Sequence, residues 1–254
     1  MERAYRLKIA GITDTGHVRS NNEDAIAWNT QLGIALLSDG VGGNKAGEIA
    51  SEMATKDLLK LLDDKLTKSL KLSQNEGVSQ FATLIKMAIS SISKQIFTKA
   101  NTEEKFSRMA ATLVAVVLYE NKIVVAHVGD SRIYRLRNDR FEVLTKDHSL
   151  INEMVDNGAV SPEDASTNPY QNVITRALGM NDKVDAEIQE LDVITNDVYL
   201  MCSDGLYGMI SDTEVWKMLA DTKGNWEQCV QDLVNLANER GCKDNISIII
   251  LHLA

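Results

Sequence analysis

Four aspartates stand at the ends of separate apolar segments that resemble strands. Asp39, Asp130 and Asp204 each follow such a segment directly, and Asp244 precedes the last one. A single aspartate in this place is usually a turn former or a helix cap. Four of them would converge if the strands lie side by side, and converging carboxylates raise each other's pKa unless a cation neutralises them. The pattern therefore predicts a site for divalent ions, which prefer oxygen ligands.

The residues around Asp39 and a charged segment upstream add to this hypothesis. The glycines of DGVGG let the backbone approach a ligand closely, and the Gly40 carbonyl is free to coordinate a metal. The stretch matches neither GxGxxG nor GxxxxGK[ST], which argues against a nucleotide loop. In RSNNED, Arg19 offers a planar fork that matches phosphate oxygens, with Glu23 and Asp24 close by. By itself such a segment is an ordinary charged loop.

Patterns typical of a protein nucleophile are missing from the sequence. It contains no GxSxG motif and no Cys close to a His, and Ser38 and Ser203 have no obvious base nearby. The four histidines are scattered, and His127 and His252 fall in strand-like runs, where a core or edge position is the usual role. The residues therefore favour a metal site over covalent catalysis.

Composition limits the class of protein. A chain of 254 residues with 44% hydrophobic residues can bury a full core, which excludes disorder. The net charge of −9 argues against a nonspecific nucleic-acid partner. Three separated cysteines without a CxxC pair favour a reducing compartment, and no segment approaches 18 apolar residues. We expect a cytoplasmic monomer without nucleic-acid or membrane partners.

Strand-like runs fill the middle of the chain, with helical stripes before and after them. The expected strands cover residues 33–37, 112–119, 122–128, 132–137, 140–144, 198–202 and 246–253. The expected helices cover 46–62, about 81–96, a segment opened by a Ser211–Glu214 capping box, and about 226–240, which Gly241 ends. Residues 68–80 are polar and predicted to be a loop, and the helix after Asp39 is expected to begin near Asn44. This order indicates an α+β fold with antiparallel sheets.

Seven motifs in order give the chain a resemblance to a known family. They span about Leu7 to Leu253 and read DTGHVRSNNEDA, SDGVGGNKAGEIAS, AHVGDSRIYRL, TKDHSLINEMVDNG, NVITRALG, CSDGLYGMISDTEV and GCKDNISIIIL. Together they resemble the metal-dependent protein phosphatases of type 2C, the PPM family, in their bacterial form. The resemblance implies one catalytic domain over residues 1–254. Its fold would be a four-layer α/β/β/α sandwich of two antiparallel sheets flanked by helix pairs, with a flap at about 149–175.

The resemblance also implies metal ligands. Asp39 would bridge two Mn²⁺ or Mg²⁺ ions, and the Gly40 carbonyl would bind one of them. Asp204 and Asp244 would bind the other, and Asp130 would share a third, weaker ion with Asp204. A water that bridges the two core ions would lose its proton near neutral pH and attack phosphorus in line with the leaving oxygen.

Further residues match the family's supporting positions. Arg19 would bind the substrate phosphate. Glu23 and Asp24 would support the ions through waters and the neighbouring backbone, and Asn245 would support Asp244. The implied activity is hydrolysis of phosphoserine and phosphothreonine in proteins, reversing bacterial serine/threonine kinases, so that the partners are the kinases and their targets.

Three departures from the family pattern leave alternatives open. Val41 stands where some members carry a histidine proposed as a general acid, Ala111 stands in MAAT where MGTT is common, and 168–172 differ from the frequent His-Pro-x-x-Asn. The first two departures motivate an alternative function, a catalytically weak phosphoprotein-binding regulator of the same fold. A narrower phosphatase for anti-sigma-factor antagonists ranks lower, because those shorter relatives generally lack RSNNED.

Overall fold

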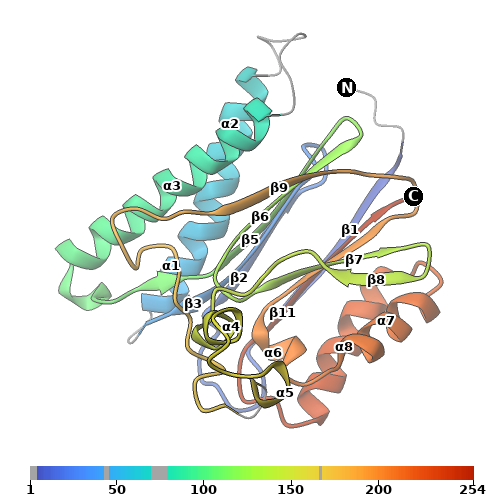
Figure 1. Ribbon diagram of the computed structural model, residues 1–254. Coiled ribbons are helices and arrows are strands. Elements are labelled where there is room, and N and C mark those ends of the chain that lie inside the picture. The colour runs from blue at the N-terminus through green and yellow to red at the C-terminus, as the bar shows by residue number, and fades with distance from the viewer. Residues whose placement is uncertain (1–4, 43–45, 70–78, 166–167) are drawn as a thin grey trace.

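Two antiparallel sheets form the centre of the molecule (Figure 1). The computed structural model describes residues 5–42, 46–69, 79–165 and 168–254. The first sheet has the order β1 (Leu7–Asp14), β11 (Ile246–Leu253), β10 (Val198–Cys202), β7 (Arg132–Arg137) and β8 (Arg140–Val143). The second has the order β2 (Asp24–Asn29), β3 (Ile34–Val41), β5 (Leu113–Tyr119), β6 (Lys122–Val128) and β9 (Glu187–Asp192), and the short β4 (Ala110–Ala111) pairs with β3.

Helices cover the outer face of each sheet. The second sheet packs against α1 (Ala46–Glu52), a π-helical turn (Met53–Asp57), α2 (Leu58–Ser69) and α3 (Ser79–Thr102). The first sheet packs against α7 (Asp212–Asp221) and α8 (Trp226–Glu239). Shorter helices are η2 (Glu104–Phe106), α4 (Leu150–Asp156), α5 (Pro162–Ala165) and α6 (Asp204–Tyr207). None of the helices within the described residues is long and apolar enough to cross a bilayer. The predicted α/β/β/α architecture is confirmed.

The alternation of side chains explains why the layers stack in this way. Successive residues of a strand point to opposite faces of its sheet. In β5, Leu113, Ala115 and Val117 pack under the helices, while Val114 and Val116 pack between the two sheets. Both faces of the strand are therefore buried, which matches its continuous apolar run.

Several predicted boundaries need correction. The strand predicted at 33–37 continues to Val41, and the helix predicted at 46–62 runs to Ser69 with a π-helical turn in it. Residues 68–69 and 79–80 of the predicted loop are helical, while 70–78, like the expected start near Asn44, lie outside the described residues. The Ser211–Glu214 capping box is confirmed, with both of its hydrogen bonds formed. The sequence patterns did not predict β1, β2, β9 or the two-residue β4.

Candidate active site

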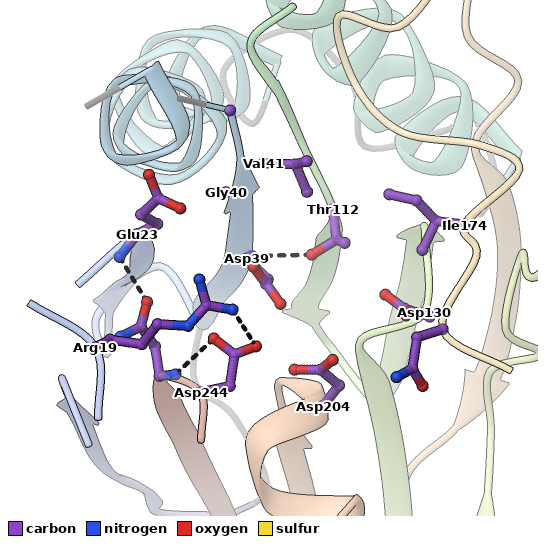
Figure 2. Close-up of a pocket in the computed structure, with 13 residues that line it drawn as sticks. Arg19, Glu23, Asp39, Gly40, Val41, Thr112, Asp130, Ile174, Asp204 and Asp244 are labelled. Atoms are coloured by element: carbon purple, nitrogen blue, oxygen red, sulfur yellow. Dashed lines mark hydrogen bonds and ion pairs between the residues drawn. The ribbon is translucent and has the colours of Figure 1, made fainter. Parts of the chain in front are cut away.

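A cavity of about 340 Å³ opens at one end of the sandwich, where strands of both sheets end (Figure 2). Eight of the nine residues predicted from the sequence line it: Arg19, Glu23, Asp39, Gly40, Asp130, Asp204, Asp244 and Asn245. The lining is completed by Val41, Gly42, Thr112, Asn172 and Ile174. The ninth predicted residue, Asp24, lies behind the cavity wall, where it is 8% exposed. The structure thus brings the predicted residues together from separate segments.

The four aspartates come from different strand ends. Asp39 is in β3, Asp204 opens α6 directly after β10, Asp130 follows β6, and Asp244 precedes β11. Figure 2 shows their carboxylates pointing toward one shared space. Because the two sheets pack face to face, strands that lie far apart in the sequence end at the same rim of the sandwich. This is the convergence that the sequence pattern predicts.

Thr112, which the sequence analysis missed, fixes the end of β3. Its Oγ1 accepts a hydrogen bond from the Asp39 N–H at 2.9 Å, and its own N–H donates to the Asp39 carbonyl at 2.8 Å. The Ser131 hydroxyl lies 2.7 Å from the same Oγ1. Ala111, one of the departures, is buried and exchanges two backbone hydrogen bonds with Leu178. Since Thr112 supplies the hydroxyl at this strand, the alanine at 111 leaves Asp39 anchored.

Asp24 connects the two sheets behind the cavity. It lies opposite Asp39 in the pairing of β2 with β3. The Ser203 hydroxyl donates to Asp24 Oδ2 at 2.7 Å and accepts from the Ser247 N–H at 3.0 Å. Burial raises the pKa of Asp24 to about 6, although the hydrogen bonds from Ser247 and Ser203 oppose this shift. Asp24 therefore supports the site through strand geometry and contributes no atom to the cavity wall.

The aspartates at the cavity are buried close to one another, with too little positive charge beside them to neutralise their carboxylates. Burial, followed by repulsion from neighbouring aspartates, raises the pKa of Asp39 well above its ordinary value and that of Asp204 to about 7. Burial and then Asp147 raise the pKa of Asp130 to about 6. Within the described residues, Asp204 Oδ1 is buried without a hydrogen-bond partner. Converging carboxylates with an unpartnered buried oxygen fit hard divalent cations, whose ligands are oxygens.

Arg19 lines the cavity beside these acids and forms an ion pair with Asp244. Its Nη2 donates to Asp244 Oδ2 at 2.7 Å, and its Nε donates to the Lys243 carbonyl at 3.2 Å. Partial burial lowers the pKa of Arg19, but the hydrogen bond and the charge of Asp244 outweigh it and raise the pKa overall. The Arg19 side chain is 49% exposed. A half-exposed guanidinium at the edge of the cavity can exchange its carboxylate partner for a phosphate oxygen.

Asn245 fixes the loop that carries Arg19. Its Oδ1 accepts from the Glu23 N–H at 2.8 Å, and its Nδ2 donates to the Thr15 and Asn21 carbonyls at 2.9 and 3.0 Å. Figure 2 shows the Glu23 carboxylate directed away from the aspartates. The family resemblance predicted that Asn245 supports Asp244. Its hydrogen bonds to residues more than 200 positions away leave no local signal in the sequence.

Comparison with known proteins gives one consistent family. The profile described as Protein phosphatase 2C matches residues 14–248. A serine/threonine phosphatase, stp, of Listeria welshimeri is 35% identical over 242 residues, covering 94% of this chain and 93% of the relative. The crystal structure of the Mycobacterium tuberculosis serine/threonine phosphatase PstP/Ppp has a TM-score of 0.84 and 29% identity, covering 97% and 98% of the two chains. A PstP catalytic domain in complex with two manganese ions has a TM-score of 0.81 and 28% identity, covering 98% of each.

Proposed function

The chain belongs to the protein phosphatase 2C family and is a metal-dependent serine/threonine protein phosphatase, and from this premise we propose that the cavity of Figure 2 is its active site. One observation carries the assignment: the carboxylates of Asp39, Asp130, Asp204 and Asp244 face one cavity, with Arg19 beside them. The family and the activity that the sequence resemblance implied are confirmed by the similarity to known phosphatases.

The ions would be held by residues that already converge. Asp39, the Gly40 carbonyl, Asp204 and Asp244 would hold two Mn²⁺ or Mg²⁺ ions, and Asp130 with Asp204 would hold a third. When bound, such ions lower the pKa of a water and stabilise negative charge on phosphoryl oxygens. Asp204 Oδ1, which finds no hydrogen-bond partner among the residues that the structure describes, supports this assignment, because a buried carboxylate oxygen needs a donor or a cation.

The segment between Ser149 and Thr175 would act as the flap of a single catalytic domain. Asn172 and Ile174 of this segment line the cavity, and Figure 2 shows Ile174 across it from Arg19, which supports a role in substrate access. The substrates would be proteins phosphorylated on serine or threonine, and the protein would reverse the work of serine/threonine kinases. Three free, buried cysteines suit action in the reducing environment of the cytoplasm. The protein would act there as a monomer.

The test is phosphate release from a phosphothreonine peptide. Mn²⁺ is titrated in and then removed with EDTA, and the Asp204→Asn variant runs beside the wild type. We expect turnover that depends on Mn²⁺, stops with EDTA and is lost in the variant. A folded wild type that binds the peptide tightly but releases no phosphate at saturating Mn²⁺ would overturn the proposal and favour the phosphoprotein-binding regulator.

Replacing Arg19 separates phosphate binding from ion binding. Arg19→Ala is expected to lower kcat/KM for the phosphopeptide by about 10²-fold, because a charge-assisted, two-pronged contact with the phosphate is lost. Arg19→Lys should recover part of the loss, since it retains the charge but not the planar fork. The measurement is steady-state kinetics at saturating Mn²⁺. Unchanged kcat/KM in the alanine variant would remove Arg19 from the substrate site.

A further inference from the structure

His148 lies just outside the active-site cavity and is 6% exposed. It directly precedes Ser149, which caps α4. Its ring stacks on that of His127, with 4.7 Å between the centroids and 17° between the planes. The proposed function assigns no role to either histidine.

The hydrogen bonds of His148 define its tautomer. The Gly129 N–H donates to His148 Nδ1 at 3.0 Å, so Nδ1 carries no proton and Nε2 carries it. Nε2 then donates to Glu187 Oε1 at 3.0 Å. Arg176 Nη1 lies 3.1 Å from Nε2, but two donors cannot bond each other, and Arg176 also faces Glu187 Oε1 at 3.5 Å. Burial lowers the pKa of His148, which favours the neutral ring.

The same bonds argue against a second cation site. Ligand atoms of His127, His148 and Glu187 lie within 4.8 Å of one another. However, His127 Nε2 lies 2.9 Å from the Lys146 carbonyl, to which it can only donate. Both Nε2 atoms therefore carry protons, and the Arg176 guanidinium adds positive charge beside them. The cluster is a hydrogen-bonded network.

The backbone of His148 joins two parts of the active site. Its N–H donates to the Gly129 carbonyl at 2.9 Å, and its carbonyl accepts from the Thr175 N–H at 2.9 Å. A bridge between Ser149 and Ile174 continues this pairing. His148 therefore links Gly129, which precedes Asp130, to Thr175, which follows the cavity-lining residues of the flap.

Close packing restricts the conformation of the turn at Gly129. Gly129 has φ +100°, and a Cβ atom there would lie 2.7 Å from the side chain of Thr112. The turn thus packs on Thr112, which anchors Asp39, while His148 holds it from the other side. The position of the Asp130 carboxylate depends on both contacts.

On the basis of the proposed function, we propose that His148 is a positioning residue: its Nδ1 fixes the Gly129–Asp130 turn so that Asp130 can hold the weakest ion. The ring touches neither substrate nor ions and acts through the Gly129 N–H. The Glu187 carboxylate, by accepting from Nε2, keeps Nδ1 free as an acceptor. Removal of groups that orient metal ligands typically weakens metal binding by about 10–100-fold.

Two variants distinguish the acceptor from the bulk of the ring. His148→Leu removes the acceptor, whereas His148→Asn places an amide Oδ1 close to the position of Nδ1. We expect the leucine variant to weaken the weakest class of Mn²⁺ sites by about 10-fold or more, measured by calorimetry and by electron paramagnetic resonance of free Mn²⁺. The asparagine variant should recover most of that affinity. His252→Leu, whose Nδ1 has no partner within the described residues, is the matched control.

Hydrogen exchange of the Gly129 N–H gives a second readout that requires no metal. Exchange should be faster in the leucine variant and close to the wild-type rate in the asparagine variant. Should leucine fail to fold, His148→Phe keeps a ring beside His127 without an acceptor, and the same criteria apply. Equal Mn²⁺ affinity and equal exchange in a folded variant without the acceptor would overturn the proposal, and so would equal losses in both variants. A wild type that binds no Mn²⁺ would count against the proposed function, while the exchange comparison still tests the hydrogen bond.

Discussion

Asp39→Asn should reduce metal-dependent turnover by on the order of 10³-fold or more, because a bound ion contributes several kcal/mol to such a reaction. The same substitution should stabilise the metal-free protein, since it removes one charge from a group of converging carboxylates. In the presence of EDTA, we expect Tm to rise by at least about 2 °C, the shift that 1 kcal/mol produces in a domain of this size. Addition of Mn²⁺ should raise Tm in the wild type much more than in the variant.

The free energy of unfolding of the metal-free protein should depend on pH, because several of its aspartates have raised pKa values. Asp24 and Asp130 have a pKa of about 6 in the folded protein and Asp204 about 7, against about 3.9 in an unfolded chain. Between these limits the folded state binds more protons, so the free energy of unfolding of the metal-free protein falls as the pH rises from about 4 to 7. Asp39→Asn should flatten this decline.

A matched control tests whether position matters more than charge. Asp221 is exposed at the end of α7 and does not line the cavity. Asp221→Asn removes the same charge and should change neither turnover nor the Mn²⁺ response of Tm. An Asp39→Asn protein that keeps full turnover would defeat the assignment of Asp39.

Gly40→Ala should lower the free energy of unfolding more than a glycine-to-alanine change at an open position does. A Cβ atom at Gly40 would lie 2.1 Å from the Gly47 carbonyl oxygen and 2.6 Å from that of Glu23, and both are backbone atoms that cannot rotate away. We expect a loss of about 3 kcal/mol or more in the free energy of unfolding, as for overpacking at its severe end. Urea denaturation measures this loss, and Mn²⁺ binding should weaken with it.

Gly224→Ala is the control for this substitution. Gly224 has φ +85°, and a Cβ atom there would meet no atom of the described residues within 4 Å. Alanine at this position therefore has a conformational cost alone, about 1–2 kcal/mol. Equal losses at the two positions would show that the close approach of β3 to α1 has no importance for stability.

Three of the strands that sequence analysis missed share one property. β1, β2 and β9 are edge strands of their sheets. An edge strand is less enclosed and needs fewer apolar residues, as EIQELD in β9 illustrates. The edge strand β8 was predictable because a turn at Asn138 and Asp139, both with positive φ, gives a hairpin signal.

In the active site, too, some residues could be predicted from the sequence and others could not. The aspartates were predictable because each follows or precedes an apolar run, and that pattern is local. The contacts of Thr112 with Asp39 and of His148 with Gly129 join residues 73 and 19 positions apart. Such contacts depend on how the sheets pack, so no local spacing reveals them.

The pairing of β1 with β11 has a consequence for synthesis on the ribosome. Leu7 lies opposite Leu253, so the first strand has no neighbour in its own sheet until the last strand has emerged. At about 5–20 residues per second, the wait between them lasts roughly 10–50 s. During that time Asp244 is also absent, and a nascent chain can neither close its first sheet nor complete its active site. Incomplete translation products would therefore be inactive and would expose an unpaired strand to proteases and chaperones.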